Sequence, residues 1–175
     1  MHSNFQKYFV FIDKFDKLFL DRLPKNIFLI YRIKNNNYNL KTLTKLEHFC
    51  KMKSRKLYIS NNIKLAIKLN LDGAYIPSFN SNKKHLSYSV KKNFILLGSA
   101  HNVYEMRTKE LQRVNAIFLS SIFKKNKNYL GINKFKLLSN LTNNKVIALG
   151  GIANKNLKKL KLVKCFGFAG ISFFE

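Results

Sequence analysis

Long apolar runs and paired cysteines are absent from this 175-residue sequence. Its longest apolar runs, such as Phe94–Gly98, are far shorter than the roughly 20 residues that a membrane-spanning helix needs. The N-terminus also lacks the layout of a signal peptide, so we expect a cytoplasmic protein without a membrane span. Cys50 and Cys165 stand alone in helix-like segments, which indicates neither a disulfide framework nor a metal site and favours buried thiols.

Acidic residues are also scarce, with 8 Asp and Glu against 33 Lys and Arg and a formal net charge of +25. Such a basic surface attracts nucleic acid or anionic membrane by electrostatics alone, so we expect non-specific nucleic-acid binding in vitro. No helix-turn-helix, zinc-finger or aromatic RNA-binding signature accompanies the charge. Only five of the basic residues are arginines, and the abundance of Lys, Asn, Ile and Phe also follows from codons rich in A and T. We favour this second explanation.

What the chain does contain is hydrophobic sequence, 46% of all residues with 14% aromatic, which predicts a single folded domain over residues 1–175. Segments with helical spacing, for example residues 40–49, alternate with apolar runs of strand length. There are eight such runs: Tyr8–Asp13, Ile27–Lys34, Lys56–Ser60, Gly73–Pro77, Phe94–Ala100, Asn115–Phe123, Lys145–Gly151 and Gly167–Ser172. Only the segment after the fourth run has a poor helical pattern.

Continuous apolar strands that alternate with helices indicate a parallel sheet with right-handed crossovers. Eight such units predict an α/β fold, a compact (β/α)₈ TIM barrel of eight parallel strands, although this class usually runs to about 250 residues. An open doubly wound sheet is the main alternative. Its glycine-rich phosphate turn commonly follows the first strand, whereas the glycines here come late.

The late glycines follow the seventh predicted strand, in the stretch VIALGGIANKN over residues 146–156. Two glycines allow positive φ or a close approach of the backbone, and the turn after a strand is a common place for phosphate. In barrels, the loops after strands seven and eight frequently form a phosphate site. We therefore expect the amides of Gly150, Gly151, Ile171 and Ser172 to bind phosphate. A tight turn without a ligand is the alternative.

Several motifs together resemble one family. LGSAH (Leu97–His101) is followed by Glu105, and FLSSIF, VIALGGI and FAGIS come later in the same order and spacing as in the thiamine phosphate synthase and TenI family. The resemblance runs from about Ile27 to Ser172. The family's strand-two motif Q-x-R-x-K appears as IYRIK, which keeps Arg32 and Lys34. The resemblance implies a barrel that binds a phosphorylated thiazole.

The family has two branches, and this chain departs from the first. The synthase, a transferase, joins a pyrimidine diphosphate to a thiazole phosphate with Mg²⁺ held by aspartates after strands three and four. Here those positions read Asn61, after Ser60, and about Asn80. The Thr-rich diphosphate loop is replaced by KKNKNYLG, in which Lys127 is expected either to bind phosphate or to lie in a solvated turn.

Pro77-Ser78 favours the second branch, the TenI-like thiazole tautomerases, which are isomerases that need no metal or other cofactor. The resemblance then implies His101 as general acid or base, with Ser99 orienting the substrate or the imidazole. Arg32 and Lys34 would pair with a carboxylate or phosphate, or project into solvent. Mg²⁺ is expected only for the synthase alternative. A third hypothesis is a degenerate barrel that binds phosphorylated ligands or nucleic acid without turnover. A homo-oligomer is common in the family.

Overall fold

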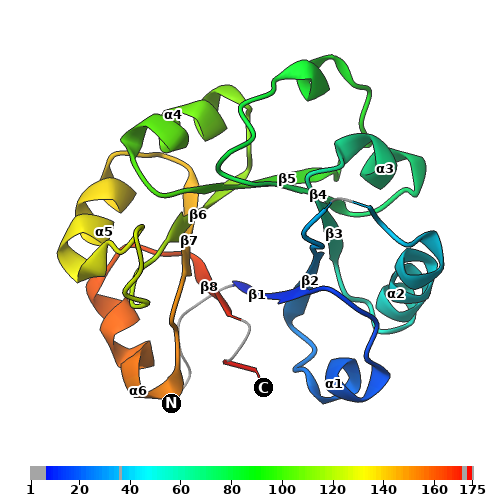
Figure 1. The fold of residues 1–175 in the computed structure, drawn as a ribbon, viewed down its shortest axis with the longest axis horizontal. Coiled ribbons are helices and arrows are strands. Elements are labelled where there is room, and N and C mark those ends of the chain that lie inside the picture. The colour runs from blue at the N-terminus through cyan, green and yellow to red at the C-terminus, as the bar shows by residue number, and fades with distance from the viewer. Residues whose placement is uncertain (1–6, 36, 171–172, 175) are drawn as a thin grey trace.

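The computed structural model describes residues 7–35, 37–170 and 173–174. In it, eight parallel strands close into a barrel in which each strand pairs with the next and β8 pairs with β1 (Figure 1). The strands are β1 Lys7–Ile12, β2 Ile27–Tyr31, β3 Leu57–Ser60, β4 Gly73–Ile76, β5 Ile95–Ala100, β6 Ala116–Ser120, β7 Lys145–Leu149 and β8 Gly167–Gly170. Each lies within or against a predicted apolar run, so the predicted (β/α)₈ barrel is confirmed.

Helices surround the barrel (Figure 1). They are α1 Lys17–Arg22, α2 Leu40–Met52, α3 Ile63–Lys68, α4 Val103–Leu111, α5 Gly131–Asn140 and α6 Asn154–Leu157. After β4 the described chain forms only one 3₁₀ turn, η1 Lys84–Ser87, where the helical pattern is poor. No helix in the described ranges is long and apolar enough to cross a bilayer.

The last helical segment is shorter than the sequence predicts. The spacing of its leucines predicts a helix that reaches Cys165, but α6 ends at Leu157 and continues as a 3₁₀ segment, η2 Lys158–Leu162. Short 3₁₀ segments are common at the ends of α-helices. Cys165 therefore lies outside a helix and is half-buried, whereas Cys50 is buried as expected; both thiols are free.

Aromatic side chains fill the inside of the barrel. Phe9 and Phe11 of β1 belong to the inner cluster, while Val10 and Ile12 between and after them pack on the helix side, as the alternation of a strand requires. The ring centroids of Phe9 and Phe118 lie 5.0 Å apart in an edge-to-face arrangement. The filled interior leaves space for a ligand only toward the ends of the strands.

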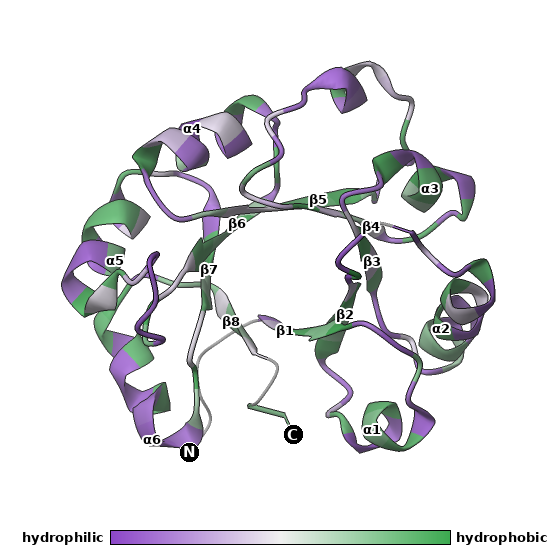
Figure 2. Cartoon of the chain, viewed as in Figure 1, coloured by the Kyte–Doolittle hydropathy of each residue, from purple (hydrophilic) through white to green (hydrophobic). Residues whose placement is uncertain are grey.

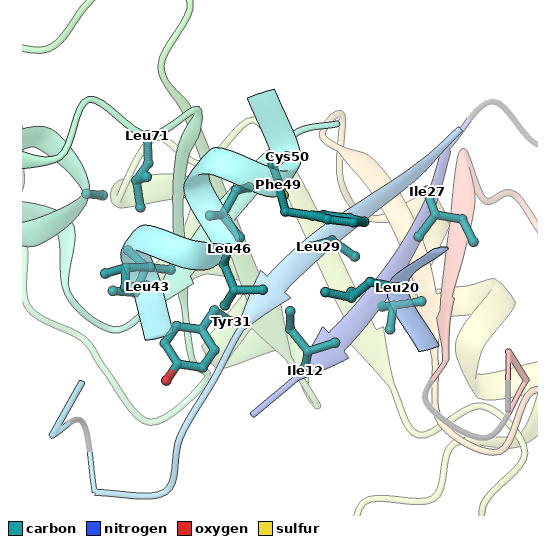
Figure 3. Close-up of a cluster of buried hydrophobic side chains, with 14 of the residues drawn as sticks. Ile12, Leu20, Ile27, Leu29, Tyr31, Leu43, Leu46, Phe49, Cys50 and Leu71 are labelled. Carbon is teal, nitrogen blue, oxygen red and sulfur yellow. The ribbon is translucent and has the colours of Figure 1, made fainter. Parts of the chain in front are cut away.

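The outer layer is formed by apolar helix faces that cover the strands. Figure 3 shows Leu46 and Phe49 of α2 packed beside Leu29 of β2. The side chain of Asn39 begins this helix by accepting a hydrogen bond from the Thr42 amide at 3.2 Å. Figure 2 shows hydrophilic and hydrophobic residues mixed along the helices. Because all eight strands are parallel, their carboxyl ends lie at one end of the barrel, which we call the mouth.

Candidate functional site

A cavity of about 290 Å³ opens at the mouth. It is lined by residues at or after the ends of β2 to β7: Arg32, Ile33, Lys34, Ser60, Tyr75, Pro77, Ser78, Phe79, Ser99, His101, Ser120 and Leu149. The lining residues that the structure describes include no carboxylate. The cations Arg32 and Lys34 are exposed at its edge. The cavity is therefore suited to an anionic ligand.

The junction of β5 and α4 positions His101. The Asn102 side chain caps α4 by accepting from the Glu105 amide at 2.9 Å. The carboxylate of Glu105 reaches back and accepts a hydrogen bond from the His101 amide at 2.6 Å. The backbone of His101 is thus fixed by the helix that follows it. This gives Glu105 of the family motif a structural role.

The imidazole of His101 is oriented by Ser120 at the end of β6. Its Nδ1 lies 2.8 Å from the Ser120 carbonyl oxygen and 3.0 Å from the Ser120 hydroxyl. A carbonyl only accepts, so Nδ1 of the neutral ring carries the proton and Nε2 keeps its lone pair. No residue in the described ranges hydrogen-bonds to Nε2. The ring is therefore arranged as a proton acceptor.

Ser120 is a site residue that sequence reasoning missed. Parallel register pairs Ala100 of β5 with Leu119 of β6, which places the next residues, His101 and Ser120, side by side. The sequence could have pointed to this pair only if the last residues of both strands were known, and an apolar run does not give exact strand ends. The contact between His101 and Ser120 is therefore known only from the register of β5 and β6.

Ser99 lies on the floor of the cavity, two residues before His101, and is buried. Its side chain hydrogen-bonds with Tyr75 rather than with the imidazole. Burial raises the pKa of the Tyr75 hydroxyl, while the Ser99 hydrogen bond and the charge of Arg32 act in the opposite direction. The phenol stays protonated at neutral pH and completes a polar floor.

The glycine turn after β7 has a packing reason. Gly150 and Gly151 have φ values of +104° and +74°. A Cβ on Gly150 would lie 2.3 Å from Ser121 Oγ, and one on Gly151 would lie 2.6 Å from the Lys124 amide nitrogen. The Gly150 carbonyl accepts from the amides of Phe123 and Lys124. The glycines therefore let the loop between β6 and α5 approach closely.

The turn also leaves donors available. The amides of Gly150 and Gly151 donate no hydrogen bond to another residue within the described part of the chain. They follow Leu149, which lines the cavity. Two backbone N–H groups that have no hydrogen-bond partner among the described residues, next to a residue that lines the cavity, are suited to an anion.

The remaining predicted residues are placed as follows. Strand β2 ends at Tyr31, earlier than predicted, so Arg32 and Lys34 lie in the loop after it, yet both line the cavity. The Arg32 guanidinium stacks 4.5 Å from the ring centroid of Phe11. Lys127 is exposed and is not among the described residues that line the cavity. Ile171 and Ser172 lie outside the described residues.

Comparison with known proteins decides the family. A family model described as thiamine monophosphate synthase matches residues 23–174. The chain belongs to the thiamine monophosphate synthase family. The thiamine-phosphate synthase of Methanococcus vannielii is 26% identical over 119 residues, which cover 66% of this chain and 57% of that protein. The chain therefore spans less than two thirds of this relative.

Two further proteins resemble the chain. The thiamine-phosphate synthase of a Hydrogenobaculum species is 25% identical over 148 residues, which cover 81% of this chain and 69% of that protein. The structure of a thiamine phosphate pyrophosphorylase from Pyrococcus furiosus superimposes with a TM-score of 0.74 over 97% of this chain and 87% of the other, at 16% identity. At that identity the superposition shows a shared fold.

The metal that the family resemblance implies for a synthase does not fit the residues present. Asn61 and Asn80 stand at the expected aspartate positions, and Asn80 Nδ2 donates to Asn61 Oδ1 at 2.7 Å. The Asn80 carbonyl accepts from the buried ammonium of Lys109 at 2.7 Å. Mg²⁺ prefers carboxylate oxygens. In residues 7–35, 37–170 and 173–174, no group of three His, Cys, Asp or Glu side chains could hold a metal ion.

Proposed function

We propose that the chain is a metal-independent tautomerase that moves a proton within a phosphorylated thiazole carboxylate and so aromatises the ring. The observation that carries the proposal is the imidazole of His101, whose Nδ1–H is held by Ser120 and whose Nε2 has no hydrogen-bond partner in the described part of the chain. In a tautomerisation one proton leaves the substrate at one atom and one is delivered at another. An imidazole that accepts and then donates a proton supplies this chemistry without a second reactant.

The charge around the cavity supports an anionic substrate. We assign the phosphate to the amides of Gly150 and Gly151, and the carboxylate to Arg32 and Lys34, because guanidinium and ammonium groups form charge-assisted hydrogen bonds with carboxylates. Ser99 is assigned a further hydrogen bond to the ligand from the cavity floor. Phosphate binding by Ile171 and Ser172 stays a prediction.

The test is turnover of the thiazole carboxylate phosphate by the purified chain in the presence of a metal chelator. We expect aromatisation, and we expect His101→Asn to lower kcat by about 10²–10⁴-fold, the range for loss of a general acid or base. His48→Asn is the matched control, because His48 is an exposed histidine on α2. Unchanged turnover in His101→Asn would remove the imidazole from the mechanism.

The synthase activity is the second candidate, and the names of the relatives favour it. Its test supplies the pyrimidine diphosphate, the thiazole phosphate and Mg²⁺ together. Formation of thiamine phosphate only when Mg²⁺ is present would establish this activity. No product under these conditions, with aromatisation in the chelated assay, would establish the tautomerase. No turnover in either assay, with calorimetric binding of the thiazole phosphate, would identify a non-catalytic barrel.

A further inference from the structure

A phenyl ring stands exposed at the edge of the cavity. Phe79 follows β4, lines the same cavity as His101, and is 77% exposed. Single exposed hydrophobic residues are ordinary on protein surfaces and need no explanation by themselves. The position of Phe79 beside the proposed reacting groups, and the way its backbone is held, set it apart.

The turn that carries Phe79 is anchored by buried side chains. The Asn80 amide donates to the Pro77 carbonyl at 3.1 Å, which closes a turn over residues 77–80 that contains Phe79. The Asn80 carbonyl accepts from Lys109 Nζ at 2.7 Å and from Gln112 Nε2 at 2.9 Å. Both of these side chains have 0% exposure. The backbone on either side of Phe79 is therefore fixed, and the ring is presented to solvent by a well-bonded turn.

The cavity offers polar groups for charges and for a proton, but a planar ring also needs an apolar surface to lie against. Besides the His101 imidazole, two aromatic side chains line the described cavity, and of these Tyr75 is 3% exposed and packs within the barrel interior. Phe79 is the one whose surface is open. Its ring would be covered by a ligand that fills the cavity.

We propose that Phe79 packs against the face of the heteroaromatic ring of the ligand and selects planar ring phosphates over alkyl phosphates. The identity of that ring as a thiazole rests on the proposed function. Stacking of a heteroaromatic ring on an aromatic side chain is worth roughly 5- to 150-fold in affinity. Because Phe79 is exposed, its replacement leaves the folded core untouched.

The experiment compares calorimetric binding of the thiazole phosphate and of ethyl phosphate, which has no ring. We expect Phe79→Ala to weaken binding of the thiazole phosphate by roughly 5- to 150-fold and to leave that of ethyl phosphate within about twofold. Tyr104→Ala is the matched control. Tyr104 is an aromatic residue on α4 with 79% exposure that is not among the residues lining the cavity.

Phe79→Trp gives a second measurement, because the sequence contains no tryptophan. We expect tryptophan emission to change on titration with the thiazole phosphate, at the calorimetric Kd, and to stay constant with ethyl phosphate. Equal binding by wild type and Phe79→Ala, or equal weakening for both ligands, overturns the role of Phe79 and leaves the proposed function standing. If the wild type fails to bind the thiazole phosphate, both are overturned.

Discussion

At the ends of β5, β6 and β7, hydrogen bonds hold an imidazole and a glycine turn in place, while Nε2 of His101 and the amides of Gly150 and Gly151 have no hydrogen-bond partner among the described residues. At the ends of β3 and β4, by contrast, the side chains of Asn61 and Asn80 hydrogen-bond to each other. We call the ends of β5, β6 and β7 the first half of the mouth and the ends of β3 and β4 the second half. In the first half, polar groups remain for a ligand in the proposed function. In the second half, the side chains of Asn61 and Asn80 form a hydrogen bond within the protein.

The two halves therefore differ in role: the groups proposed for chemistry lie in the first, and structural hydrogen bonds hold the loops of the second. The family motifs on β5 and β7 supply the groups that we propose for proton transfer and phosphate binding. The β3–β4 half carries amides where a synthase would need carboxylates, and its turn is tied to Lys109 and Gln112 of the β5–β6 segment. We therefore expect changes in the two halves to have different consequences.

The largest effect on stability is expected in the first half, at Gly150. Gly150→Ala combines left-handed strain of about 1–3 kcal/mol with a clash against Ser121 that costs about 1–3 kcal/mol. We expect the free energy of unfolding to fall by about 2–6 kcal/mol in chemical denaturation. Gly131→Ala is the matched control, because Gly131 also has positive φ, but the atoms nearest its Cβ would belong to the Tyr129 side chain, the hydroxyl being closest at 3.2 Å. Equal losses in the two variants would show that the close packing of Gly150 against Ser121 makes no separate contribution to the free energy of unfolding.

A smaller effect is expected in the second half, and it is asymmetric. Asn80 is the donor of the amide pair, and its orientation is fixed because its Oδ1 accepts from the Asn82 amide. Asn80→Asp places a carboxylate against the Asn61 oxygen, so we expect the free energy of unfolding at pH 7 to fall by about 1–3 kcal/mol. Asn61→Asp keeps an acceptor for the Asn80 amide and should be close to neutral. The same loss in both variants would contradict the assigned direction of the bond.

The sequence predicts the barrel well because its strands are buried on both faces and therefore appear as continuous apolar runs. It also places His101 and the glycine turn at strand ends, where the structure has them, because short motifs mark both positions. It does not reveal side-chain contacts between neighbouring β/α units. The bond between Asn61 and Asn80 spans 19 residues, and Lys109 reaches Asn80 over 29 residues. Neither partner is marked by local periodicity.

Lys109 is a residue whose burial cannot be predicted from its type. A lysine on a short helix is expected to be solvated, yet Lys109 has 0% exposure and lies beneath Gly98 of β5, which has no side chain to displace it. Its ammonium donates to the Asn80 carbonyl and to Gln112 Oε1 at 2.8 Å. A buried cation of this kind is satisfied by its partners, and these partners are known only from the folded structure.

A pH-dependent effect on stability is expected from the titration of Lys109. Burial lowers the pKa of its ammonium to about 8, from an ordinary value of 10.5. Between these two pH values the unfolded chain holds the proton more often than the folded chain does, so this lysine makes the free energy of unfolding rise with pH across that window. The rise is complete above the ordinary pKa and absent below about pH 8.

Lys109→Met removes the titrating group and keeps an unbranched apolar chain. We expect the free energy of unfolding of the wild type, minus that of Lys109→Met, to increase as the pH rises from 8 to 10.5, in urea denaturation at constant ionic strength. Taking the difference cancels the titration of the other lysines, which is large in a chain of net charge +25. Lys134→Met is the matched control, because it removes the same charge from an exposed position on α5. A flat difference for Lys109→Met would mean that the ammonium beneath the turn that carries Phe79 is solvated, and the β3–β4 half would then lack a buried anchor.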